Sequence, residues 1–139
     1  MGTPELVALL GVLLGAFLVH KLTSGRELRS VRRTAATEFH KAFADSLLNL
    51  AQTDISTARI VREFDGRHSA AIAAFRPYLP FWKRGRFENA VHRLDQTCEP
   101  YRNAGPLTLF SKELGSAASD NRAAIALAIR DLLAFAPLV

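Results

Sequence analysis

Residues 28–50 read LRSVRRTAATEFHKAFADSLLNL, and this stretch decides the fold class of the chain. Its apolar side chains recur every three or four residues, which is the period of an α-helix with one face turned towards a core. Arg29, Arg33 and Lys41 lie on a different face. The stretch therefore predicts one long amphipathic helix that ends near residue 52. Its apolar positions are Leu28, Val31, Ala35, Phe39, Ala42, Phe43, Leu47 and Leu50.

Two further helices are expected downstream. One covers about residues 56–76 and ends at Pro77 and Pro80, because proline cannot continue a helix without losing a hydrogen bond. Its apolar face holds Val61, Phe64, His68, Ala71, Ile72 and Phe75, and Asp65-Gly66 is a point where it can break in two. The next helix starts between Pro80 and Phe87 and ends before Pro100. Its apolar positions step by four and three: Phe87, Val91, Leu94, Cys98 and Tyr101.

The remaining stretch predicts two more helices. Pro106 and Gly115 bracket a short one, following the rule of proline first and glycine last. Ser119 or Asp120 caps the last helix, whose face holds Ile125, Ala128, Ile129, Leu132, Leu133 and Ala136. We interpret residues 123–139 as a packed helix and not as a membrane span, since Arg130 and Asp131 sit at its middle. No stretch alternates with period two, so we expect an all-α, irregular three- to four-helix bundle.

The amino-terminal part resembles a membrane anchor. Leu6–Val19 is a charge-free apolar run of fourteen residues, and extending it from Thr3 to Leu22 gives twenty, about what a bilayer needs. A cleaved signal peptide and a buried core helix are the alternatives. We expect a transmembrane helix over residues 1–23, followed by a cytoplasmic helical domain over residues 24–139. Ser24 to Glu27 has the form of a capping box, which indicates a new helix start unless the helix runs straight on.

Charge and small residues refine this expectation. Lys21, Arg26, Arg29, Arg32 and Arg33 follow the apolar run, and positive residues stay on the cytoplasmic side, so the amino terminus is placed outside. The same five residues are candidates for contact with anionic lipid. Gly11 and Gly15 form a Gly-x-x-x-Gly pair, which permits close approach of two helices and makes both candidates for self-association.

Composition excludes several classes of protein. The net charge is +5, and the chain has one cysteine, Cys98, so an internal disulfide and a cysteine-based zinc or iron–sulfur site are excluded within one chain. Cys98 falls on an apolar face and is interpreted as a core residue. There is no nucleophile motif, Walker loop or dinucleotide-binding motif. We expect no catalytic residue, no cofactor and no metal ligand.

Histidines are the remaining candidates for chemistry. His68 lies three residues after Asp65, a helical spacing at which a carboxylate tunes an imidazole. The more frequent case is a packed histidine whose nitrogens are satisfied. His40, His68 and His92 lie on three different expected helices and could hold a metal ion only if those helices brought them together. Nothing in the sequence shows that they do.

Residues 77–87, PYLPFWKRGRF, have the most unusual local composition and include the one tryptophan. A mixture of aromatic and basic residues suits a lipid headgroup interface or a partner protein, and it also suits stacking on single-stranded nucleic acid. The simplest interpretation is a helix–helix corner whose aromatics fill the core while the cations face water. The candidate interface residues are Tyr78, Phe81, Trp82, Lys83, Arg84 and Arg86.

The whole pattern resembles a set of uncharacterised small bacterial inner-membrane proteins. The resemblance rests on the amino-terminal anchor, on residues 39–50, on residues 68–79 and on the ending Asp131-Leu-Leu-Ala-Phe-Ala136. It implies a bacterial inner-membrane location and an all-helical domain, and no activity attaches to it.

We therefore expect a single-pass protein whose helical domain is a protein-interaction or scaffold module at the cytoplasmic face of the inner membrane. Its expected partners are membrane lipid and another protein or a second copy of itself, and we do not expect nucleic acid. The alternative is a small membrane-active protein of phage or stress type. An enzyme that uses His68 is a less favoured alternative.

Overall fold

The computed structural model describes residues 3–103, 105 and 116–138, and for most of residues 3–24 and for 116–117 it describes the helix but not the side chains. The elements are α1 (Thr3–Ala51), α2 (Thr57–Phe75), a 3₁₀ turn (Arg76–Tyr78), α3 (Phe81–Arg102) and α5 (Ser116–Leu133). The described ranges contain helices and no strand, which confirms the all-α class.

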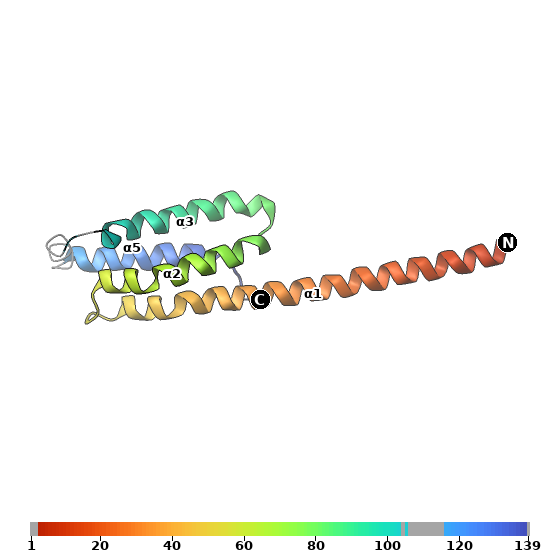
Figure 1. The fold of residues 1–139 in the computed structure, drawn as a ribbon, viewed down its shortest axis with the longest axis horizontal. Coiled ribbons are helices and arrows are strands. Elements are labelled where there is room, and N and C mark those ends of the chain that lie inside the picture. The colour runs from red at the N-terminus through yellow and green to blue at the C-terminus, as the bar shows by residue number, and fades with distance from the viewer. Residues whose placement is uncertain (1–2, 104, 106–115, 139) are drawn as a thin grey trace. The chain divides into compact units, whose positions relative to one another are not determined.

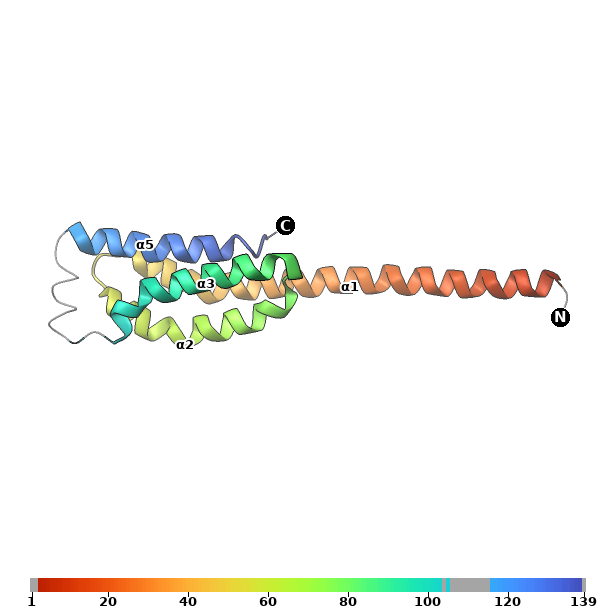
Figure 2. The same ribbon diagram turned by 90° about the horizontal axis from the view of Figure 1, so that it is seen from above.

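The chain divides into two compact units, Met1–Thr34 and Ala35–Val139. The first unit is the amino-terminal part of α1. The second unit is a helical bundle, in which the part of α1 after Ala35 lies beside α2, α3 and α5 in both Figure 1 and Figure 2. The bundle expected from the sequence is therefore confirmed, and the side-chain clusters and cavities described below lie in this second unit.

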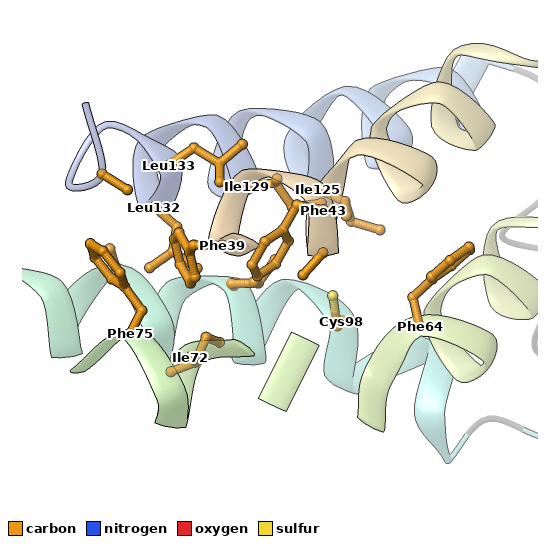
Figure 3. Close-up of a cluster of buried hydrophobic side chains, with 14 of the residues drawn as sticks. Phe39, Phe43, Phe64, Ile72, Phe75, Cys98, Ile125, Ile129, Leu132 and Leu133 are labelled. Atoms are coloured by element: carbon orange, nitrogen blue, oxygen red, sulfur yellow. The ribbon is translucent and has the colours of Figure 1, made fainter. Parts of the chain in front are cut away.

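Phenylalanine rings form the centre of the bundle core (Figure 3). The ring of Phe39 on α1 stacks on Phe75 of α2, with centroids 4.5 Å apart, and meets the edge of Phe43 at 5.1 Å. Phe87 of α3 lies 6.2 Å from Phe39. From α5, Ile125, Ile129, Leu132 and Leu133 close the core. The bundle helices thus bury the faces that their apolar periods predicted, and α1 does so from Ala36 onwards.

Local signals set the helix boundaries. The Ser56 hydroxyl accepts a hydrogen bond from the Arg59 backbone amide and caps α2. The 3₁₀ turn with Pro77 ends α2, and α3 begins directly after Pro80. Leu79 between them is buried, so the chain turns the corner with an apolar side chain anchored in the core.

Three tertiary hydrogen bonds tie α1 and α5 to the segments at each other's ends. The guanidinium of Arg122 on α5 donates to the backbone carbonyls of Gln52 and Ile55, in the connection between α1 and α2. His40 on α1 has its Nε2 2.7 Å from the carbonyl oxygen of Ala136, and a protonated Nε2 donates there. All three bonds satisfy backbone acceptors that lie outside the regular helices.

The predicted membrane anchor is wrong. Across the residues that the structure describes, no helix carries an apolar stretch long enough to cross a membrane. The physical reason lies in the length of Leu6–Val19: fourteen residues fall short of the roughly 20 that a bilayer core requires, and Glu5, His20 and Lys21 flank the run. The single-pass arrangement, the outside amino terminus and the inner-membrane location are corrected together with it.

Several smaller expectations also change. Leu28 and Val31 are exposed, and the buried face of α1 begins at Ala36. The helix runs through Ser24 to Glu27 without a new start, and α2 does not break at Asp65-Gly66.

The last two differences concern helix ends. Pro100 lies inside α3, which continues to Arg102, because the last turn buries Cys98 and Tyr101 and so compensates for the lost hydrogen bond. Because α5 already begins at Ser116, neither Ser119 nor Asp120 caps it. The short helix expected between Pro106 and Gly115 lies outside the described residues.

Candidate functional site

The corner between α2 and α3 exposes two large aromatic side chains. Phe81 and Trp82 occupy the first turn of α3, and 79% and 67% of their surface is open to solvent. Their rings meet edge to face with centroids 5.1 Å apart. Tyr78 in the preceding turn is also exposed. The expectation that the corner aromatics fill the core is thus wrong for these three residues, and it holds for Phe87 alone among the aromatics of this segment.

The helical rotation of α3 explains this division. Phe87, Ala90 and Leu94 are buried and fix the side of α3 that faces the core. At about 100° per residue, Phe81 and Trp82 then lie on the opposite side of the same helix. No neighbouring turn covers them, because Pro80 stands immediately before the first residue of α3.

Three cations accompany the exposed rings. Trp82 and Arg86 share one face at a spacing of four, and Lys83 and Arg86 share one at a spacing of three. Lys83 and Arg86 also line a hollow of about 240 Å³, together with Ala134 and Phe135 at the end of α5. The Phe135 ring is held in place by the core, since it packs edge to face on the buried Phe87 with ring centroids 5.6 Å apart.

The positive charge of this corner is not neutralised locally. Arg84 donates its Nε hydrogen to the Leu79 carbonyl, which carries no formal negative charge. The nearest carboxylate in sequence, Glu88, is already held by Arg76, with Nε–Oε1 and Nη2–Oε2 distances of 2.6 and 3.0 Å. Within the described ranges, no ion pair involves Lys83 or Arg86. We call Tyr78, Phe81, Trp82, Lys83, Arg84 and Arg86 the aromatic–basic corner.

A second polar cluster surrounds Arg102 near the end of α3. Its Nη2 lies 2.6 Å from Oδ1 of Asp65 on α2, and its Nη1 lies 2.6 Å from Oδ1 of Asp95. Glu99 adds a longer contact at 3.6 Å. Burial disfavours the charged guanidinium, but the hydrogen bonds to Asp95 and Asp65 outweigh it and raise the pKa of Arg102 above its ordinary value.

His68 contacts a serine. Its Nε2 lies 2.7 Å from Oγ of the buried Ser46, and that hydroxyl donates to the Phe43 carbonyl at 3.0 Å. Because a serine has one hydroxyl hydrogen, His68 must donate from Nε2 when both bonds are made. The Ser46 hydroxyl then donates its proton to a carbonyl of its own helix and accepts one from His68. A nucleophilic serine would instead donate its proton to a base.

The surroundings of His68 keep it uncharged near neutrality. Burial between the rings of Phe43 and Phe64 lowers its pKa to about 4, although Asp65 acts in the opposite direction. No hydrogen bond joins Asp65 to His68 in the described structure, because Asp65 is held by Arg102. His68 is therefore packed between aromatic rings with its Nε2 bound to Ser46, which is close to the simpler interpretation. Cys98 is buried nearby, and burial raises the pKa of its thiol to about 11.

The other candidate residues do not come together. His40 bonds to the Ala136 carbonyl and His92 is exposed, so the three histidines remain apart. Among the described residues, no three or more histidine, cysteine or acidic side chains are placed to hold a metal ion.

Candidates in the first unit remain predictions. Gly11 and Gly15 lie in α1, and their surroundings, like the side chain of Lys21, lie outside what the structure describes. Arg26, Arg29, Arg32 and Arg33 are exposed on the same helix. Self-association through the glycines and lipid contact by the cations are therefore both untested.

Comparison of the chain with family models, with curated proteins and with solved structures finds no match. The resemblance to uncharacterised small bacterial proteins thus stays a prediction, whereas the inner-membrane location that it implies is wrong for the reason given above.

Proposed function

We propose that the helical bundle of residues 35–138 is a protein-interaction module that binds an acidic segment of a partner protein at its aromatic–basic corner. The observation that carries the proposal is the exposure of Phe81 and Trp82 beside three cations. Exposed aromatic residues and arginine are the residue types that contribute most to binding energy at protein interfaces.

The charge of the corner favours a partner of opposite sign. Lys83, Arg84 and Arg86 are adjacent, and the neighbouring Glu88 is engaged by Arg76. An acidic segment gains from these charges during diffusional encounter, while an apolar anchor on that segment finds the Phe81 and Trp82 rings and the hollow next to Phe135. The expected complex therefore combines one or two apolar anchors with a surrounding set of carboxylates.

Trp82 makes the test direct, because it is the one tryptophan of the chain and its indole is exposed. The first experiment titrates the full chain with a synthetic helical peptide that carries glutamates around two leucines, and follows tryptophan emission. We expect a blue shift with the acidic peptide and none with its glutamine-for-glutamate counterpart. Phe81→Ala with Arg86→Gln should weaken binding by at least about tenfold, which corresponds to the loss of about 1.4 kcal/mol.

A matched control distinguishes specific binding at this corner from nonspecific binding to exposed apolar residues. Leu48 and Leu127 are exposed apolar residues on α1 and α5, so Leu48→Ala with Leu127→Ala removes a similar apolar area elsewhere. The control should bind the acidic peptide as the wild type does. Equal binding of both peptides, or a response to anionic vesicles or single-stranded oligonucleotides that exceeds the response to the acidic peptide, would contradict the proposal.

The natural partner is then sought by affinity purification of the full-length protein from its native source, followed by mass spectrometry. The wild type, the corner variant and the control variant are compared side by side. A stoichiometric companion retained by the wild type and the control, and lost with the corner variant, supports the proposal. Recovery of the chain alone, with sedimentation showing a defined oligomer, would replace the partner with a second copy.

A further inference from the structure

The bundle encloses a cavity of about 250 Å³ that is partly open to solvent. Its apolar walls come from α1, α2, α3 and α5, with Leu50, Ile60, Ile72, Leu94, Ile125 and Ile129 among them. Its polar lining includes Asp65, Asp95 and Arg102. An apolar body with a few polar groups is the usual constitution of a site for a small organic molecule.

The volume limits the size of such a molecule. A dry protein cavity of about 150 Å³ holds benzene, so about 250 Å³ corresponds to roughly ten non-hydrogen atoms. This is a fragment-sized compound, with room for one ring or a short branched chain and one polar group.

The charges at the cavity decide the sign of the polar group. Arg102 contacts three carboxylates, those of Asp65, Asp95 and Glu99, and Arg76 is bound by Glu88. Of these groups Asp65, Asp95, Arg76 and Arg102 line the cavity, so the charges of its lining balance, and both guanidinium groups are already bound to carboxylates. An anionic ligand would find the Arg102 hydrogens already donated to Asp65 and Asp95, and the Arg76 hydrogens already donated to Glu88.

A cation meets the opposite situation. The carboxylates of Asp65 and Asp95 are partly exposed, and a carboxylate oxygen has lone pairs for more than one hydrogen bond. An ammonium group in the cavity can therefore bind both without displacing Arg102. His68, held neutral inside, adds no positive charge that would repel it.

We infer that this cavity is a binding site for a small organic amine, with its apolar body between α2, α3 and α5 and its ammonium group at Asp65 and Asp95. The site is separate from the aromatic–basic corner, so the failure of one proposal leaves the other standing.

Three compounds that share a phenylethyl group and differ in the charge of their polar group test the sign. The full chain is titrated by calorimetry with 2-phenylethylamine, with 2-phenylethanol and with 3-phenylpropanoate. We expect the amine to bind about tenfold more tightly than the alcohol and the carboxylate to be the weakest. Equal affinities, a preference for the carboxylate, or no binding of any of the three at millimolar concentration would overturn the inference.

Two acidic residues provide a matched pair of variants. Asp95 and Asp45 both pair with an arginine, with side chains 58% and 60% exposed, but Asp95 lines the cavity and Asp45 does not. Asp95→Asn should weaken amine binding about fivefold and leave alcohol binding unchanged, whereas Asp45→Asn should change neither. Amine binding that is insensitive to Asp95→Asn would place the amine elsewhere and overturn the assignment.

A cavity-filling variant locates the apolar body. Val91 is half-buried and lines the cavity, so Val91→Phe reduces its volume. We expect it to abolish binding of both the amine and the alcohol. Its circular dichroism is compared with that of the wild type, and if it does not fold, the Asp95 and Asp45 variants still decide the outcome because their side chains are at the surface.

Discussion

Arg102 on α3 contacts a single carboxylate oxygen of Asp65 on α2 twice, with Nε at 2.8 Å and Nη2 at 2.6 Å from Oδ1. This pair joins two helices across 37 positions of sequence. Because Asp95 and Glu99 lie on the same side of α3, the guanidinium also neutralises repulsion between three carboxylates.

Replacing this arginine is expected to destabilise the bundle. Arg102→Met keeps much of the apolar stem and leaves the three carboxylates unpaired, so we expect a loss of about 1–3 kcal/mol in the free energy of unfolding. Urea denaturation measures it. Arg59→Met is the control, since its pair with Glu63 is 3.9 Å long and well exposed, and it should cost at most about 0.5 kcal/mol. Equal costs for the two variants would contradict the bridging role.

The pH dependence of stability should carry the signature of His68. Its folded-state pKa of about 4 lies below the unfolded value of 6.5, so only the unfolded chain binds the proton between these values. Stability is therefore complete above pH 6.5 and falls as the pH is lowered to about 4, by up to about 3 kcal/mol.

Comparison with a variant isolates this contribution, because carboxylates titrate in the same range. His68→Leu should show a shallower loss of stability between pH 6.5 and 4 than the wild type does in urea denaturation. His92→Gln should keep the wild-type slope, since His92 is exposed. A wild-type slope in His68→Leu would mean that the imidazole is charged in the folded protein.

Truncation of Phe39 and of Phe81 should change the free energy of unfolding by very different amounts. Phe39 is buried against Phe43 and Phe75, so Phe39→Ala is expected to cost about 3–5 kcal/mol. Phe81 is mostly exposed, so Phe81→Ala should lie within about 0.5 kcal/mol of the wild type. Thermal unfolding followed by circular dichroism distinguishes the two. A large loss for Phe81→Ala would show that the corner is a structural element.

The thiol of Cys98 should react slowly. Burial raises its pKa from 9.0 to about 11, which reduces the reactive thiolate about 100-fold at pH 8. Alkylation by iodoacetamide, followed by mass spectrometry, should therefore be slow in the folded protein and fast in urea. Similar rates in the two states would place the sulfur at the surface.

Helix faces could be predicted from the sequence, because burial on a helix follows a fixed period. Phe64, Phe75, Leu94 and Cys98 are all buried as their spacing indicated. Partners across helices could not be predicted in this way. The sequence predicts a contact between Asp65 and His68 because they are three residues apart on one helix. The actual partner of Asp65 is Arg102, which reaches it only because α2 packs on α3.

The corner shows a second limit. The sequence predicts a start of the third helix between Pro80 and Phe87, so it does not say whether Phe81 and Trp82 follow the helical rotation of about 100° per residue. With the start at Phe81, the rotation alone places Trp82 away from Phe87. Pro100 is a third example. Local propensity predicts that the helix ends before this proline, but α3 continues to Arg102 because Tyr101 is buried in the core.

The Arg122 guanidinium that spans the Gln52 and Ile55 carbonyls has a consequence for synthesis of the chain. A ribosome releases α1 and α2 well before it reaches Arg122 and the isoleucines of α5. Until then the emerging segment lacks the hydrogen bonds from Arg122 to the connection between α1 and α2. It also lacks the α5 side chains that cover one side of the phenylalanine core. We therefore expect nascent chains stalled before residue 122 to remain sensitive to protease, and protection to arise as one late step once α5 has emerged.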